Sequence, residues 1–297
     1  MTREWAAVVV AYDSGPLLLD CVRSLLSDDS AGAPPVVVVV DNFVSSKPGE
    51  SVAQIEAEFP SVSVIRPGAN LGYARAANLG IAATKAEIVA VINPDAILVA
   101  GSAAGVMDRF QSEPTLGALG PKIREANGEI YPSARSVPSN LDALGHALFG
   151  SIRPNNKATR RYRELDRDPE VARHVDWVSG AAVWLRREAL NQIGGWDEAY
   201  FMYVEDVDLC WRLKGAGWGV GYSPSAQVTH VQGVSTGRTP FRMIAAHHRS
   251  AFRFANKRWS GAKRVLLAPT ALLLSLRCGV AMLSQLVRHP RASVRVP

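Results

Sequence analysis

The first 120 residues alternate between two hydrophobic periodicities, and this alternation restricts the possible folds more than any other feature of the sequence. Continuous apolar runs of strand length occupy residues 5–11, 36–40, 62–65 and 88–92. Apolar side chains recur at helical spacing in the segments between them, at residues 16–26, 52–59 and 70–84. Strands buried on both faces and separated by helices are typical of βαβ units. We therefore predict an α/β fold, with a Rossmann-like, mostly parallel central sheet flanked by helices.

Three aspartates, Asp13, Asp41 and Asp95, each follow one of the predicted strands. In parallel sheets, ligands bind beyond the carboxyl ends of the strands, so these side chains are candidate ligand contacts. An aspartate such as Asp95 after a strand is commonly a turn former. Its carboxylate can also bind Mg²⁺ or Mn²⁺ on a nucleotide diphosphate.

Several common nucleotide-binding and hydrolase motifs are absent from the sequence. It contains no Gly-x-x-x-x-Gly-Lys-Ser/Thr, no Gly-x-Gly-x-x-Gly after the first strand and no Gly-x-Ser-x-Gly. These absences argue against a P-loop NTPase, a dinucleotide-dependent dehydrogenase and an α/β-hydrolase.

The alternation ends beyond residue 120. Asn127-Gly128 predicts a hairpin turn, residues 133–175 predict a loop-rich excursion, and residues 177–185 are again apolar. Residues 203–208 should begin a helix that runs through Leu213, because acidic residues favour a helix start.

Acids and histidines in this second part allow both structural and chemical interpretations. The cluster Glu205-Asp206-Val207-Asp208 is either a set of helix-capping acids or the location of a general base that takes a proton from an attacking hydroxyl. His230, after a strand-like run, is either a core histidine or a metal ligand. His247 and His248 are expected to be surface or packing residues.

Charge is distributed unevenly along the chain. All 27 acidic residues lie at or before Asp208, whereas residues 209–297 hold 14 of the 33 basic residues. Such a basic segment predicts an anionic partner, either a nucleic acid or a membrane surface. The basic face has few aromatic residues and no nucleic-acid module is recognisable, so we favour the membrane and expect no nucleic acid.

Residues 265–287 are mostly apolar and long enough to cross a bilayer, but Pro269 and Arg277 interrupt them. A central arginine makes spanning costly, by about 2.5–3.5 kcal/mol. We prefer an amphipathic helix in the membrane interface over a packed helix or a span. Three widely spaced cysteines and the absence of a signal-peptide pattern favour a reducing cytoplasm, at the inner face of the membrane. The oligomeric state, monomer or homodimer, stays open.

Taken together, several short motifs resemble the inverting glycosyltransferases of family 2, which have the GT-A fold. They lie at residues 8–12, 39–42, 69–74, 93–95, 194–198, 201–203 and 205–209, with His230 after them. The resemblance covers about residues 5–260. Within the family, residues 120–121, 131–135, 177–180, 200–206 and 235–238 are most similar to actinobacterial rhamnosyltransferases. Those enzymes move L-rhamnose from dTDP-rhamnose to N-acetylglucosaminyl-diphospho-polyprenol in arabinogalactan linker synthesis.

The resemblance implies a role for each matching residue. Asp206 would be the catalytic base, with Glu205 beside it. Asp95 and His230 would hold Mg²⁺ or Mn²⁺. The nucleotide-sugar residues would be Ala11, Tyr12, Asp13, Asp41, Asn70, Gly72, Asn78 and Asn93. The acceptor residues would be Trp177, Gly180, Tyr203 and Arg238.

The chain departs from the family pattern at two of these places. Asn93 occupies the first position of the Asp-x-Asp element, and Asn42-Phe43-Val44 stands where the family usually continues Asn-Gly-Ser. We expect a glycosyltransferase domain over residues 1–240 and a basic helical region over residues 241–297. The domain would consist of a nucleotide-sugar half up to about residue 120 and an acceptor half after it. The alternatives are a UDP-sugar-dependent transferase of the same family and, more distantly, a nucleic-acid-binding protein.

Overall fold

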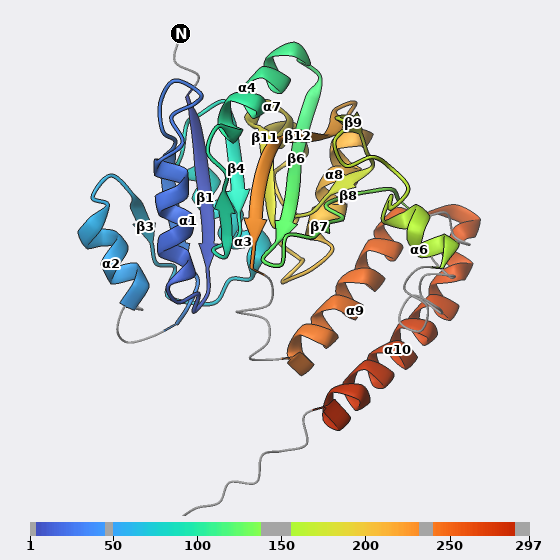
Figure 1. Ribbon diagram of the computed structural model, residues 1–297. Coiled ribbons are helices and arrows are strands. Elements are labelled where there is room, and N and C mark those ends of the chain that lie inside the picture. The colour runs from blue at the N-terminus through green and yellow to red at the C-terminus, as the bar shows by residue number, and fades with distance from the viewer. Residues whose placement is uncertain (1–3, 45–49, 138–155, 232–239, 289–297) are drawn as a thin grey trace, which may run out of the picture.

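A computed structural model of the protein describes residues 4–44, 50–137, 156–231 and 240–288. Its centre is one large twisted sheet with helices on both faces (Figure 1). The sheet strands are β1 (Trp5–Ala11), β2 (Val36–Asp41), β3 (Ser63–Ile65), β4 (Ile88–Ile92), β5 (Ala96–Leu98), β6 (Leu116–Glu125), β7 (Ile130–Tyr131), β9 (Arg173–His174), β11 (Ala182–Arg186) and β12 (Gly219–His230). A separate two-stranded sheet pairs β8 (Ala134–Arg135) with β10 (Trp177–Val178).

The strand order of the large sheet is β3-β2-β1-β4-β11-β6-β12-β5. Neighbours from β3 to β4 are parallel, as are β6 and β12, whereas β11 runs antiparallel between β4 and β6. The predicted mostly parallel α/β sheet is therefore confirmed. Because β1 and β4 are parallel neighbours, the segments that follow them meet at one edge, where ligands bind in such sheets.

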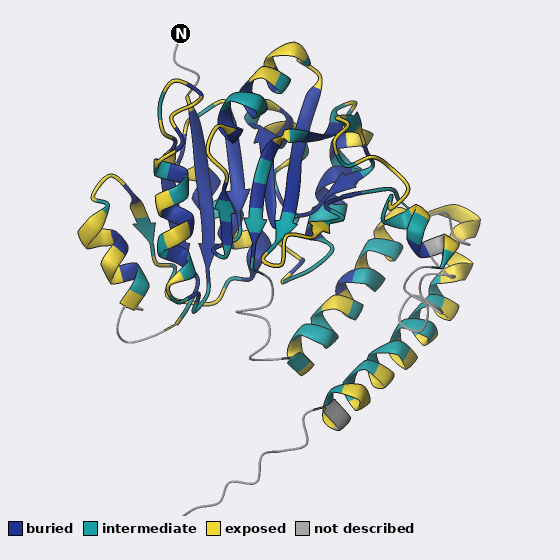
Figure 2. Cartoon of the chain, in the orientation of Figure 1, coloured by how far each residue is buried: buried dark blue, intermediate teal, exposed yellow. Residues whose placement is uncertain are grey.

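The helices cover two separate apolar faces of this sheet. They are α1 (Leu17–Leu26), α2 (Glu50–Glu58), α3 (Tyr73–Ala82), α4 (Ser102–Ser112), α6 (Lys157–Tyr162), α7 (Arg187–Ile193) and α8 (Glu205–Gly215). Alternate residues of β1 point to opposite faces: Val9 packs in the core with α1, α2 and α4, and Val8 in the core with α3, α7 and α8. Figure 2 shows the central strands buried along most of their length. A strand enclosed on both faces explains why its sequence is continuously apolar.

Beyond residue 120, some local predictions are confirmed and others fall short. The Asn127-Gly128 hairpin forms between β6 and β7, with Gly128 at φ 84°. The strand-like run expected only before His230 is the end of the much longer β12, whose pairing with β6 shifts register near Ser223. The loop-rich segment contains the short α6, and its residues 138–155 lie outside the described part of the chain.

The C-terminal region folds back on itself as a helical hairpin. It comprises α9 (Pro240–Arg258), the 3₁₀ turn η2 (Gly261–Leu266) and α10 (Leu267–Arg288). α10 packs against α9 and lies on the far side of α9 from the sheet (Figure 1). Six apolar side chains on η2 and α10, which we call the α10 stripe, are 55–75% exposed: Val265, Leu272, Leu276, Val280, Leu283 and Leu286. By length and composition alone, Gly261–Leu286 is apolar enough to cross a membrane.

Candidate active site

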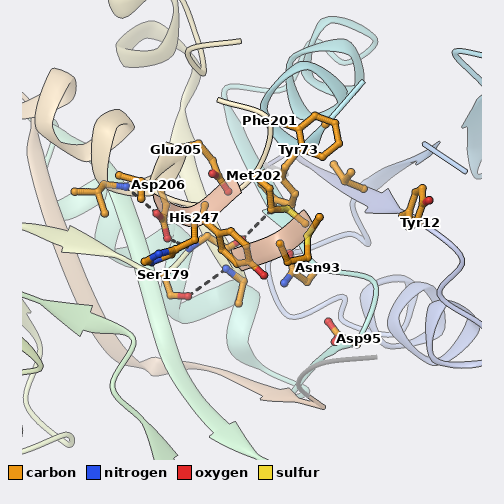
Figure 3. Close-up of a pocket in the computed structure, with 18 of the residues that line it drawn as sticks. Tyr12, Tyr73, Asn93, Asp95, Ser179, Phe201, Met202, Glu205, Asp206 and His247 are labelled. Carbon is orange, nitrogen blue, oxygen red and sulfur yellow. Dashed lines mark hydrogen bonds between the residues drawn. The ribbon is translucent and has the colours of Figure 1, made fainter. Parts of the chain in front are cut away.

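A cleft of about 480 Å³ opens where β1 and β4 end. Tyr12 follows β1 and lines one end of it, and Asn93-Pro94-Asp95 follows β4. Figure 3 shows Asp206, Glu205 and His247 at the other end, away from Tyr12 and Asp95. The cleft therefore lies where the strand-ending polar residues predict a ligand site.

The end of the cleft near Tyr12, where the sequence predicts nucleotide binding, is built around Asn42. Its side-chain amide donates to the Oδ1 of Asn70 and the carbonyl of Gly72, and its Oδ1 accepts from the amide of Leu71. Gly72 has φ 80°, and an added Cβ would lie 2.6 Å from the carbonyl oxygen of Phe201. A glycine is required there because both the backbone angle and the close approach exclude a side chain.

Of the predicted nucleotide-sugar residues, Tyr12, Asn70, Gly72 and Asn93 line the cleft. Ala11, Asp13, Asp41 and Asn78 are not among its lining residues. Asn78 instead bonds both ways with the backbone of Trp196, at 2.9 Å each, so it holds the loop before α8. Asp41 is buried beneath the cleft edge, and burial raises its pKa although Arg66 and the amide of Phe43 attract the ionised form.

The two predicted metal ligands face each other. The Nε2 of His230 lies 2.9 Å from the Oδ1 of Asp95, because β12 pairs antiparallel with β5 and brings its last residue opposite Ala96. The Nδ1 of His230 is buried and has no hydrogen-bond partner among the described residues. The sheet holds His230 in place beside Asp95, and the two side chains can still bind a further partner.

This pair fits a divalent cation that is shared with a substrate. No group of three or more His, Cys, Asp or Glu side chains in the described residues could hold a metal ion alone. Mg²⁺ is commonly held by only one or two protein carboxylates together with substrate phosphates. An Asp and a His at the mouth of a cleft suit such a shared site.

Asp206 is the carboxylate at the centre of the cleft. Its Oδ2 accepts the amide of Gly180 at 2.9 Å and its Oδ1 accepts the amide of Val207 at 2.9 Å. Gly180 comes close to it: an added Cβ would lie 3.3 Å from the Cβ of Asp206. The two amides fix the orientation of the carboxylate, which leaves its remaining lone pairs for a proton in the cleft.

The other two acids of the cluster occupy different environments. Asp208 is fully buried and bonds to Arg212 at 2.6 Å and to Lys257 at 2.7 Å, so it is a structural ion-pair partner. Glu205 is also buried, and its Oε2 has no hydrogen-bond partner among the described residues.

Burial raises the pKa of both Glu205 and Asp206, and the charge of Asp206 raises that of Glu205 further. The amides of Gly180 and Val207, with Arg135, oppose the rise at Asp206. The two carboxyls therefore differ: Glu205 tends to hold a proton, whereas the amide bonds and Arg135 favour the ionised form of Asp206, which can accept one.

The backbone just before Asp206 is strained. Tyr203 and Val204 both have φ 67°, a region that side chains with a branched Cβ rarely enter. Such residues cost about 1–3 kcal/mol each and persist where the surroundings enforce them. The ring of Tyr203 packs edge-on against His247 at 5.6 Å, so α9 helps hold the turn that aims Asp206.

At the far end of the cleft, the predicted acceptor residues Trp177, Gly180 and Tyr203 all line the wall. Arg238 lies outside the described residues. Several further lining residues that matter at this end were not assigned from the sequence: Tyr131, Arg135, Tyr162, Arg242, Met243 and His247. Tyr131 and Arg135 lie in a motif that supported the resemblance, and that motif was the signal available for them. His247, expected to be a surface or packing residue, is exposed but lines the cleft.

A comparison with protein families matches residues 3–253 to a model described as "Glycosyltransferase like family 2". Two relatives from Mycobacterium tuberculosis strains, CDC 1551 and H37Rv, are each named N-acetylglucosaminyl-diphospho-decaprenol L-rhamnosyltransferase. Each is 40% identical over 309 residues, which cover 100% of this chain and 98% of the relative.

Solved structures with the same fold are much more distant in sequence. A mannosyltransferase from Pyrobaculum calidifontis in complex with GDP-Man and Mn²⁺ is 17% identical, with a TM-score of 0.54 over 98% of this chain and 76% of that one. GalNAc-T7 with UDP, GalNAc and Mn²⁺ is 14% identical, with a TM-score of 0.58 over 77% of this chain and 44% of that one. These likenesses concern the fold alone.

Proposed function

Because this chain belongs to glycosyltransferase family 2, we propose that it transfers L-rhamnose from dTDP-L-rhamnose to N-acetylglucosaminyl-diphospho-decaprenol. The observation that carries this proposal is the 40% identity, over the whole chain, to relatives named for that transfer. The cleft supports it, because it has a nucleotide end, a central carboxylate and a far end rich in aromatic and basic side chains.

The proposed reaction is a single displacement at the anomeric carbon of the donor sugar. The carboxylate of Asp206 takes the proton from the acceptor hydroxyl as its oxygen attacks, the bond to the donor diphosphate breaks, and the configuration inverts. The amides of Gly180 and Val207 hold this carboxylate in place. Glu205, which tends to stay protonated, can donate a hydrogen bond to a sugar hydroxyl.

Asp95 and His230 would hold Mg²⁺ or Mn²⁺ together with the donor diphosphate. When bound, such an ion offsets the negative charge that grows on the leaving diphosphate. The neutral Asn93 in place of an acid leaves Asp95 as the one carboxylate of this element. We therefore expect the ion to bind weakly without the donor and more tightly with it.

The C-terminal hairpin would keep the enzyme at the cytoplasmic face of the membrane that contains its lipid-linked acceptor. The α10 stripe is exposed along the whole helix, and residues 209–297 hold 14 basic residues and no acid. Apolar side chains would enter the headgroup boundary while nearby basic residues are attracted to anionic lipid, at about 1 kcal/mol each.

The experiment that tests this function is a donor panel of dTDP-rhamnose, UDP-GlcNAc, UDP-galactose and GDP-mannose. Each donor is offered with a short-chain polyprenyl-diphosphate-GlcNAc acceptor, with and without Mg²⁺ or Mn²⁺. Transfer from dTDP-rhamnose above all other donors is the expected result. Preferred use of a UDP-sugar would contradict the rhamnosyl proposal and favour another transferase of the same family.

A further inference from the structure

A half-buried guanidinium, that of Arg135, lies at the far end of the cleft. It is held by aromatic rings: its Cζ is 4.8 Å from the ring centre of Trp177, 5.3 Å from Tyr131 and 5.7 Å from Tyr162. Its hydrogen-bond partners are neutral oxygens, the hydroxyls of these two tyrosines and the carbonyl of Pro132. Removing a cation from water is costly unless an anion accompanies it, and these partners supply none.

The segment 177–181 shows where this cation lies relative to the other groups of the cleft. At one end, Trp177 stacks on Arg135. In the middle, the amide of Gly180 bonds to Asp206, and at the other end the carbonyl of Ala181 accepts the amide of Asn93 at 2.8 Å. Arg135 and the Asn93–Asp95 turn are therefore on opposite sides of Asp206.

A second arginine reaches the same cleft from α9. Arg242 is exposed in the first turn of the helix and lines the cleft, as does His247 on the same helix. Figure 3 shows His247 on the Asp206 side of the cleft rather than beside Asp95. Two separate elements, β8 and α9, thus each contribute an arginine to one cleft.

We propose that Arg135 and Arg242 form a subsite for the diphosphate of a lipid-linked acceptor. The inference rests on the proposed function, which it makes more specific. A guanidinium presents paired N–H donors that match phosphate oxygens, and the Nη atoms of Arg135 each have one donor left beyond their bonds to tyrosine hydroxyls. A diphosphate would supply an anion in direct contact with Arg135, which its neutral hydrogen-bond partners do not.

The order of groups in the cleft assigns this diphosphate to the acceptor rather than to the donor. In an inverting displacement the hydroxyl attacks the anomeric carbon from the face opposite the departing diphosphate, and the base contacts that hydroxyl, so Asp206 lies on the acceptor side of the donor sugar. The donor diphosphate belongs with Asp95 and His230. The acceptor diphosphate then lies beyond Asp206, and its lipid leaves along α9 towards the α10 stripe.

The test compares Arg242→Gln with Arg249→Gln. Arg249 lies two turns further along α9, is also exposed and does not line the cleft, so it controls for loss of charge on the same helix face. Inhibition by farnesyl diphosphate and by farnesol is measured against the acceptor and against the donor, in detergent. Calorimetric binding of farnesyl diphosphate to the intact protein provides a readout without turnover.

We expect farnesyl diphosphate, but not farnesol, to compete with the acceptor. Arg242→Gln should weaken this competition and raise KM for the acceptor by about ten- to a hundredfold, the range for a lost charge-assisted hydrogen bond, with the KM for the donor unchanged. Arg249→Gln should behave as wild type. A rise in donor KM, competition with the donor, or equal effects of both variants would overturn the subsite.

Arg135 is tested by Arg135→Lys, which keeps the positive charge among the rings but loses the paired donors. It should weaken farnesyl diphosphate binding while the thermal unfolding midpoint stays near that of wild type. Unchanged binding by this variant would contradict a role for the guanidinium. If the wild-type protein binds farnesyl diphosphate through Arg242 but transfers no rhamnose, the proposed function fails and the subsite stands.

Discussion

The sheet body and the C-terminal hairpin differ in where they place their apolar side chains. Val8 and Val9 of β1 are completely buried between two helical layers, whereas Leu276 and Val280 of α10 are 61% and 68% exposed (Figure 2). A monomeric soluble protein rarely displays a continuous apolar stripe, and one rimmed by polar residues marks an interaction surface. The sheet body thus buries its apolar side chains within the fold, whereas the hairpin leaves an apolar surface exposed.

The two regions are nevertheless joined at the active site. Ser250 of α9 donates to the carbonyl of Met202, and Lys257 bonds to Asp208 and Asp197. These contacts lie on both sides of the turn that carries Asp206. The hairpin therefore contacts the turn that carries Asp206 through α9 and presents the α10 stripe on its other side.

The largest expected effect separates chemistry from membrane binding. Asp206→Asn should lower kcat by about 10²–10⁴-fold, since it removes the proton acceptor but keeps the shape of the side chain and an oxygen for one of the two amide contacts. Binding to anionic vesicles should not change. Steady-state transfer and vesicle co-sedimentation measure the two properties, and normal transfer by the folded variant would exclude Asp206 as the base.

The next prediction concerns a variant that should lose membrane binding rather than chemistry. Leu276→Gln with Val280→Gln should weaken binding to anionic vesicles by about 10–100-fold, because side chains of this size contribute about 1.5–3 kcal/mol each when fully transferred and these two would be only partly buried in the interface. Val36→Gln with Val171→Gln is the matched control, since these valines of the body are 58% and 53% exposed. Equal loss of vesicle binding in both double variants would mean that the α10 stripe binds the membrane no better than other exposed apolar side chains.

A third variant tests the connection between the regions. Lys257→Met should lower the unfolding free energy by about 1–3 kcal/mol, because it leaves the buried Asp208 with only Arg212 among its described cationic partners. Lys263→Met on the exposed η2 should have little effect. Denaturant unfolding measures both, and equal stability of the two variants would show that the ion pair does not hold the hairpin to α8.

This third effect should also depend on pH. Burial acts to raise the pKa of Asp197, but bonds from Lys257 and the amide of Ala199 hold it at about 2, against an ordinary 3.8. A lowered pKa stabilises the fold above the unfolded value and loses that contribution as pH falls through the folded value. The difference between wild type and Lys257→Met should therefore shrink as pH falls from about 4 towards 2.

The sequence predicts the features that depend on local patterns. The alternation of apolar runs predicts the sheet, the residues after the strands predict the edge at which the cleft opens, and the family predicted from its motifs is confirmed. The placing of Arg135 depends on the pairing of β8 with β10 across forty residues, and that of Arg242 on how α9 packs. Contacts between segments so far apart leave no periodic pattern in the local sequence. Asn78 is the opposite case: its motif predicts a nucleotide contact, but its side-chain amide bonds to the backbone of Trp196 within the fold.

The smallest expected effect concerns the cost of burying a carboxyl in the cleft. The raised pKa of Glu205 means that the folded state holds its proton more tightly than the unfolded chain, whose value is near 4.5. Wild-type stability should therefore fall as pH rises from about 4.5 through the raised value. Glu205→Gln removes this fall, so it should match wild type near pH 5 and be more stable than wild type near pH 9. Glu188→Gln, at the exposed first turn of α7, is the control, and a stability gain that is independent of pH would show that Glu205 is not a buried acid.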